Sequence, residues 1–181
     1  MTLRIVGLAA SLSRPSKTRA LVEAVASRGA TRLGATAANY DLIDLQPGLG
    51  LAAALTDLDP ATGAIVATIL SADVLVVGSP VQKGSYTGLF KHLFDLVDPA
   101  ALLGKTVILT ATGGGEKHAL VIEHQLRRLF GFFEAATLPT GIYASAADFS
   151  GDRLTSPAIL SRIDLVVEQL TDDFAHRLIP A

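Results

Sequence analysis

The sequence predicts an α/β fold in which a five-stranded parallel sheet is covered by helices on both faces. Short β-rich apolar runs alternate with longer segments of helical period, the pattern of a parallel sheet with crossover helices. Two runs, Val74–Val77 and Val107–Leu109, are unbroken in apolar residues, as expected of strands buried on both faces. The length of 181 residues suits one domain. We therefore expect a three-layer, doubly wound domain over residues 1–181.

The strands are assigned to the short apolar runs. The first follows Met1 almost directly, and the third and fourth contain the unbroken runs. The expected strands cover residues 3–8, about 38–45, 74–79, 106–111 and about 137–143.

The helices are assigned to the longer segments between these strands. Apolar residues share one face of the fourth helix at Ile122, Leu126, Leu129, Phe130 and Phe133, and the last helix repeats the pattern at Ile163, Val166, Val167, Leu170 and Phe174. The expected helices cover residues 17–32, 62–72, 88–97, 118–133 and 157–178. Residues 47–60 and 145–156 are expected to be irregular.

Composition excludes several classes of function. Lys and Arg total 15 against 17 Asp and Glu, so the net charge of −2 argues against a nucleic-acid partner. The chain has no cysteine, which excludes disulfides, thiolate nucleophiles, Cys-ligated zinc and Fe–S clusters. Any redox chemistry must then use a cofactor. No run resembles a signal peptide or an 18-residue membrane span, so we expect a cytoplasmic protein.

In a doubly wound sheet, ligands bind outside the carboxyl ends of strands where the strand order reverses. The segments after the first, third and fourth strands are therefore the candidate sites. The apolar fraction of 50%, with only 18% charged residues, also suggests that some surface is buried against copies of the same chain.

The segment after the first strand has the composition of a phosphate site. Hydroxyl and cationic side chains lead into a helix N-terminus, whose free N–H groups attract anions. The candidate phosphate-binding residues are Ser11, Ser13, Arg14, Ser16, Lys17 and Thr18. The alternative is ordinary helix capping by Ser13 or Ser16 with solvated bases nearby.

The same loop lacks the glycine fingerprints of Rossmann dehydrogenases and of P-loop nucleotide hydrolases. A terminal monophosphate fits better. Among cofactors that carry out redox chemistry without cysteine, FMN ends in that group.

Two further segments could contact the flavin ring. After the third strand, Pro80, Gly84 and Gly88 hold an irregular backbone, and backbone groups of Val81, Gln82 and Lys83 could bind the polar edge of the ring. The alternative is a turn-rich connection. After the fourth strand, Thr112 precedes three glycines, Gly113, Gly114 and Gly115, whose N–H groups could approach the pyrimidine edge; a flexible hinge is the alternative.

These segments together resemble the flavodoxin-like NAD(P)H-dependent FMN reductases. Residues 80–95 are similar to the family signature Pro-x-x-x-Gly-Ser-x-x-Gly-x-x-Lys-x-x-x-Asp, which adds Ser85 and Tyr86 to the candidate flavin-binding residues. The first loop matches at Ser11, Ser16 and Thr18, but Ala10 and Ser13 stand where the family has glycine and arginine. The resemblance implies the strand order 2-1-3-4-5.

Residues 83–88 and 103–105 look most like the reductase components of two-component alkanesulfonate and methanesulfonate monooxygenases. In some of those reductases an inserted aromatic residue forms a π-bulge at a tetramer interface, in the helix after the glycine turn. His118 is placed at or near that position, with a solvated histidine at the helix start as the alternative. The resemblance implies a homodimer or homotetramer, with residues 88–97 and 118–133 as candidate interfaces.

The expected activity is reduction of FMN by NADH or NADPH through hydride transfer to flavin N5, with FMNH2 supplied to a partner monooxygenase. Such a transfer requires stacking and exclusion of water more than a side-chain acid or base, so no catalytic side chain is assigned. His118 and His124 lie on different helix faces, and no metal site is expected. The alternatives are a quinone or azo reductase that retains FMN, a flavodoxin-like electron carrier, and a nucleotide-binding module without redox activity.

Overall fold

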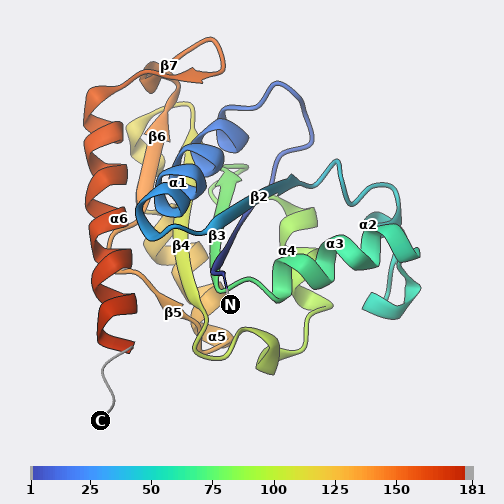
Figure 1. Ribbon diagram of the computed structural model, residues 1–181. Coiled ribbons are helices and arrows are strands. Elements are labelled where there is room, and N and C mark those ends of the chain that lie inside the picture. The colour runs from blue at the N-terminus through green and yellow to red at the C-terminus, as the bar shows by residue number, and fades with distance from the viewer. Residues whose placement is uncertain (1, 178–181) are drawn as a thin grey trace.

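The computed structural model describes residues 2–177, apart from the side chains of residues 176 and 177, and is built on a parallel sheet (Figure 1). The strand order is β2-β1-β3-β4-β5, and a further strand, β6, also pairs with β4. This confirms the expected flavodoxin-like order. The strands are β1 (Arg4–Ala9), β2 (Thr36–Asp41), β3 (Val74–Pro80), β4 (Thr106–Gly113), β5 (Ala136–Thr137) and β6 (Ile142–Ser145).

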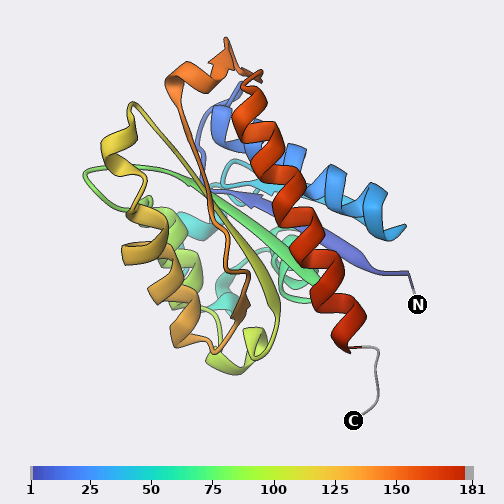
Figure 2. The same ribbon diagram turned by 90° about the vertical axis from the view of Figure 1, so that its left-hand side faces the viewer.

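Helices cover both faces of the sheet (Figure 2). On one face pack α1 (Lys17–Leu33) and α6 (Pro157–Arg177), whose buried side chains form one apolar core with the sheet. On the other face, α3 (Pro60–Leu70), α4 (Gly88–Asp95) and α5 (Arg127–Phe132) form a second core. Across residues 2–177, no helix combines the length and the apolar character needed to cross a bilayer. Leu178, the last residue expected in α6, lies outside the described residues.

The unbroken apolar runs supply both cores because alternate residues of a strand point to opposite faces. Leu75 and Val77 pack into the core of α3 to α5, whereas Val74 and Val76 pack into that of α1 and α6. Gly78 lets α1 lie close to the sheet, since a Cβ there would come within 2.4 Å of Val22 Cγ2.

Two strands differ from the sequence prediction. The expected fifth strand is divided into β5 and β6, and Pro139 lies in the interruption; a proline has no N–H to donate to a neighbouring strand. β2 ends at Asp41 instead of residue 45. The carboxylates of Asp44 and Asp41 accept the N–H groups of Asp41 and Ile43, which turns the chain out of the sheet.

The two segments expected to be irregular contain short regular elements. Residues 47–60 include α2 (Gly48–Leu51) and a 3₁₀ turn (Leu55–Asp57). The following helix, α3, begins earlier than predicted because Asp59 caps it, accepting the N–H groups of Ala61 and Thr62. Residues 145–156 form a 3₁₀ turn (Ala146–Asp148) and a hairpin of β7 (Phe149–Ser150) and β8 (Arg153–Leu154).

The expected helix over residues 118–133 is divided into three kinds of helical turn. A 3₁₀ turn (Glu116–His118) is followed by a π-helical segment (Ile122–Leu126) and then by α5. The π-helical segment therefore lies after His118, which ends the 3₁₀ turn. A further 3₁₀ turn (Pro99–Leu102) leads from α4 to β4.

Candidate functional site

A pocket of about 750 Å³ opens at the carboxyl ends of β1, β3 and β4. The three segments proposed from the sequence contribute to its wall, together with the chain that follows β6. The lining residues are Ala10, Ser11, Leu12, Ser13, Pro15, Ser16, Lys17, Thr18, Pro80, Val81, Gln82, Thr87, Thr112, Gly113, Gly114, Ser145, Ala146 and Phe149.

Hydrogen bonds connect the three segments around this pocket. The hydroxyls of Thr18 and Thr112 lie 2.6 Å apart, both buried, and join the start of α1 to the end of β4. The N–H of Val81 donates to the carbonyl of Thr112 at 2.7 Å, which joins the end of β3 to β4. The hydroxyl of Thr87 donates to the carbonyl of Ala10 at 3.3 Å. The pocket wall is therefore a connected structure.

One end of the pocket has the features of an anion site. The first N–H groups of a helix have no acceptor within the helix. In α1 the Ser16 hydroxyl accepts the N–H of Arg19 at 3.2 Å, as a capping residue does. Nearby, the Ser11 hydroxyl is buried and has no hydrogen-bond partner within the described structure. A buried hydroxyl without a partner is costly, so Ser11 Oγ indicates that a ligand group completes this end.

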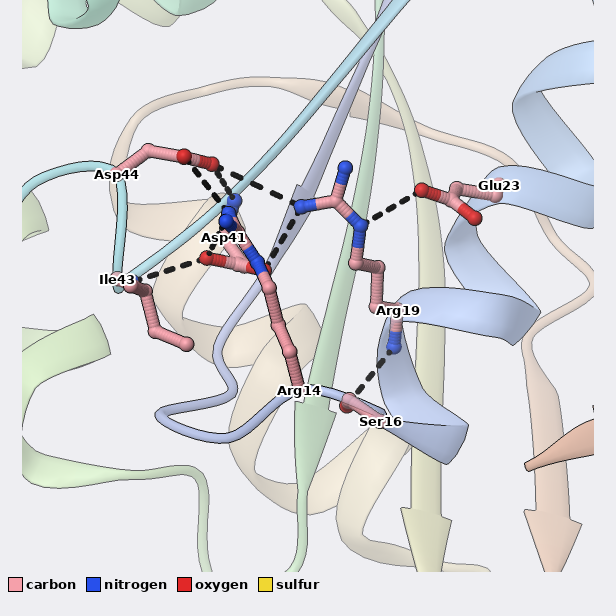
Figure 3. Close-up of polar contacts among 7 residues, drawn as sticks. All are labelled: Arg14, Ser16, Arg19, Glu23, Asp41, Ile43 and Asp44. Carbon is pink, nitrogen blue, oxygen red and sulfur yellow. Dashed lines mark hydrogen bonds and ion pairs between the residues drawn. The ribbon is translucent and has the colours of Figure 1, made fainter. Parts of the chain in front are cut away.

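Arg14, expected to bind phosphate, points toward Asp41 and Asp44 (Figure 3). Its Nε donates to Asp41 Oδ2 at 2.7 Å, and its Nη2 donates to Asp41 Oδ1 at 2.8 Å and to Asp44 Oδ1 at 2.7 Å. Arg14 does not line the pocket. Lys17 does, and its ammonium lies 5.7 Å from the centroid of the Phe149 ring.

Asp41 is ionised at neutral pH although its side chain is fully buried. Burial by itself would raise the pKa of this carboxyl, but the hydrogen bonds from Arg14 and Arg19 outweigh it and lower the pKa below its ordinary value of 3.8. Two guanidinium groups thus neutralise a buried carboxylate beside the loop of residues 10–16.

The segment after β3 lines the pocket only in part. Pro80, Val81 and Gln82 belong to the wall, whereas Lys83, Ser85 and Tyr86 do not. Gln82 and Ser85 exchange backbone hydrogen bonds across a tight turn, in which Lys83 and Gly84 have φ of 52° and 86°.

This turn directs the following residues to another surface. The Ser85 hydroxyl donates to Gln125 Oε1 at 3.2 Å, in the π-helical segment, and the Tyr86 ring packs against Phe90 with centroids 5.9 Å apart. Lys83 is exposed at the turn. The sequence signature placed these three residues together with Gln82, but the turn separates them from the pocket.

The glycine turn after β4 is held by Tyr143. Thr112, Gly113 and Gly114 line the pocket, and Gly115 does not. The Tyr143 hydroxyl donates to the carbonyl of Gly115 at 2.5 Å, and burial raises the pKa of this phenol. A Cβ on Gly113 would come within 2.3 Å of the Tyr143 hydroxyl oxygen, so only glycine fits at position 113 without displacing Tyr143.

Several lining residues were not identified from the sequence. Thr87 lies inside the family signature and could have been found there. Ser145 ends β6 and is followed by Ala146 and Phe149, in a segment predicted as a polar loop, and Phe149 is buried. Its place over the pocket depends on the β7–β8 hairpin, for which the sequence gives only the weak signal of Gly151.

The arrangement fits FMN by its chemistry. The α1 N-terminus, the hydroxyl of Ser11 and the ammonium of Lys17 supply donors for a terminal phosphate. The backbone of residues 80–82 and 112–114 forms another part of the wall. Within the described residues, no group of three or more His, Cys, Asp or Glu side chains could hold a metal ion.

Comparison with known proteins agrees with this chemistry. Residues 3–150 match the family model of the NADPH-dependent FMN reductases. The chain is 43% identical to the NADH-dependent FMN reductase SfnF of Pseudomonas fluorescens, covering 98% of this chain and 95% of that protein. It is also 43% identical to an FMN reductase (NADPH) of Pseudomonas aeruginosa, covering 96% and 94%. An oxidoreductase structure from Corynebacterium diphtheriae superposes with a TM-score of 0.80 at 34% identity, covering 94% and 96%.

Proposed function

The chain belongs to the NADPH-dependent FMN reductase family, and from this premise we propose that it reduces FMN in the pocket at the carboxyl edge of the sheet and releases FMNH2 to a partner monooxygenase. The observation that carries this assignment is the buried, unpartnered hydroxyl of Ser11 beside the N-terminus of α1. The resemblance of residues 83–88 and 103–105 to sulfonate systems supports a monooxygenase that desulfonates alkanesulfonates.

The roles of the residues follow from their positions. Ser11, Ser13, Ser16, Lys17 and Thr18 hold the phosphate, with the N–H groups at the start of α1. The backbone of residues 80–82 and 112–114 is placed to orient the ring. When bound, the isoalloxazine ring accepts a hydride from NAD(P)H at N5. No side-chain acid or base is required of this chain.

The charge of the pocket favours FMN as a substrate that dissociates. Among the described lining residues, Lys17 is the one that carries a positive charge, since Arg14 and Arg19 are paired with carboxylates outside the pocket. A phosphate dianion held by one ammonium, hydroxyls and a helix N-terminus is held less tightly than one bound by bidentate guanidinium groups. This supports release of the reduced product.

Steady-state kinetics test the proposal. We expect oxidation of NADH or NADPH to depend hyperbolically on added FMN, with free FMNH2 appearing at the rate at which the nicotinamide is consumed. A protein that is purified yellow and reduces quinones by ping-pong kinetics without added FMN would instead be an FMN-retaining quinone or azo reductase. A protein that binds FMN but does not oxidise either nicotinamide would be an electron carrier.

We further propose that the chain self-associates through the surface formed by α4, the π-helical segment and α5. A pocket of about 580 Å³ lies there, and its lining includes Tyr86, Phe94, His124 and Phe132. Phe132, in this lining, is 71% exposed. A large apolar side chain exposed in a concave surface is typical of an interface.

Replacement of Phe132 by aspartate is expected to shift the protein from an oligomer to the monomer mass of 18.8 kDa, because a carboxylate cannot be buried there without a partner. Light scattering over a range of concentrations measures this. Leu165→Asp, at an exposed leucine on α6, is the matched control and should leave the mass unchanged. A wild-type mass of one chain at every concentration would refute self-association.

A further inference from the structure

Asp41, at the end of β2, and Asp44, three residues later, face two arginines (Figure 3). Arg14 belongs to the first loop, and Arg19 to the first turn of α1. Asp41 accepts two donors from Arg14, and its Oδ2 also accepts Arg19 Nη1 at 2.7 Å. Asp44 accepts Arg14 Nη2 through Oδ1 and the N–H of Asp41 through Oδ2. Arg19 is further paired with Glu23 at 2.7 Å.

Nε and Nη2 of Arg14 already donate to Asp41 and Asp44. Nε and Nη1 of Arg19 already donate to Glu23 and Asp41. The cluster of Arg14, Arg19, Glu23, Asp41 and Asp44 contains three carboxylates and two guanidinium groups, so it has no positive charge left to offer a phosphate. A bidentate Arg–carboxylate contact with one partner fully buried also has a defined geometry. Arg14 therefore fixes where the loop lies.

The loop fixed in this way carries the hydroxyls assigned to phosphate. Arg14 lies directly between Ser13 and Pro15, and Ser16 begins the helix. Both serines line the pocket, whereas Asp41, Asp44 and the arginine do not. A displacement of the Arg14 backbone would move Ser13 and Ser16 away from a ligand held at Ser11 and Thr18.

We propose that Asp41 and Asp44 are positioning residues for the phosphate of FMN, which hold Arg14 away from the ligand and thereby fix the loop that binds it. This inference rests on the proposed FMN site. It differs from the role expected of Arg14 as a direct phosphate ligand. In that case the two aspartates would compete with the phosphate for the guanidinium group, and their removal would strengthen FMN binding.

The test compares FMN with riboflavin, which lacks the phosphate, by flavin fluorescence titration of the full chain. Asp44→Asn is the informative variant, because Asp44 is partly exposed and its loss is easier to accommodate than that of the buried Asp41. We expect Asp44→Asn to weaken FMN binding by about tenfold and to leave riboflavin binding unchanged. Tighter or unaltered FMN binding in this variant would overturn the proposal.

A double-mutant cycle shows whether Asp44 affects FMN binding through Arg14. If Asp44 acts through Arg14, the variants Arg14→Gln and Asp44→Asn weaken FMN binding by similar factors, and the double variant is no weaker than either. Additive losses would overturn the proposal. Asp164→Asn, which removes the ion pair with Arg28 on the distant part of α1, is the control and should leave the ratio of FMN to riboflavin affinity unchanged.

The wild-type protein separates failure of the inference from failure of the site. A wild type that binds riboflavin as tightly as FMN would overturn the phosphate site and the inference together. A wild type that prefers FMN, with Asp44→Asn unaffected, would overturn the inference alone.

Discussion

Replacement of Phe130 by alanine is expected to lower the free energy of unfolding by about 3–5 kcal/mol, the usual cost of truncating a buried aromatic side chain. Phe130 is fully buried in α5. Its ring meets Phe94 edge-on with centroids 5.0 Å apart, and Phe90 at 6.4 Å. Both partners belong to α4, so the substitution leaves a cavity between two helices that pack on the same face of the sheet. Chemical denaturation measures the loss.

Leu103→Ala is the control for this experiment, since Leu103 is 63% exposed and its truncation creates no cavity. Its effect is expected to stay within about 0.5 kcal/mol, as for most surface substitutions. A loss below about 1 kcal/mol for Phe130→Ala would mean that α4 and α5 are not packed through this aromatic contact.

Replacement of Ser11 by alanine is expected to weaken FMN binding about 10- to 100-fold while leaving the ligand-free protein as stable as before, or up to about 1 kcal/mol more stable. The loss of FMN affinity and the gain in stability have the same cause. In the ligand-free chain the buried Ser11 hydroxyl has no partner, and its removal relieves a cost. In the proposed complex the same hydroxyl donates to a phosphate dianion, a hydrogen bond of about 1.5–3 kcal/mol.

Flavin fluorescence titration and thermal unfolding of the ligand-free protein measure the two effects. Ser161→Ala on the exposed face of α6 is the matched control and should alter neither. If Ser11→Ala binds FMN as the wild type does, the phosphate is held elsewhere and the assignment of the first loop is wrong.

The strands and both helical layers could be predicted because apolar pattern determines them, whereas the strand order followed from the family resemblance. An unbroken run such as Val74–Val77 has only one stable environment, the centre of a covered sheet. The π-helical segment could not be predicted in this way. Ile122, Leu126, Phe130 and Phe133 are buried at intervals of three and four residues, a spacing that a continuous α-helix would also give. Local hydrogen bonding, which the apolar pattern does not specify, distinguishes the two.

The candidate site was predictable where position in the fold is enough, and not where side-chain pairing decides. Ser11, Thr18, Gln82 and Thr112 line the pocket because they lie at or just after the carboxyl ends of strands that meet there. Arg14 lies between Ser11 and Thr18 in the sequence, yet it is paired with Asp41, 27 positions later. That partner becomes a neighbour only once β2 lies beside β1, which the loop sequence cannot indicate.

The hydrogen bond between Thr18 and Thr112 connects the segment assigned to the phosphate with a segment assigned to the ring. In the proposed complex, the phosphate and the ring of FMN contact these two connected segments, so FMN acts as one ligand whose two binding groups are already covalently joined. Once one half is bound, the other is present at a high effective concentration. Riboflavin and inorganic phosphate, supplied together but unlinked, lack that advantage. FMN is therefore expected to bind more tightly than riboflavin and inorganic phosphate supplied as separate molecules.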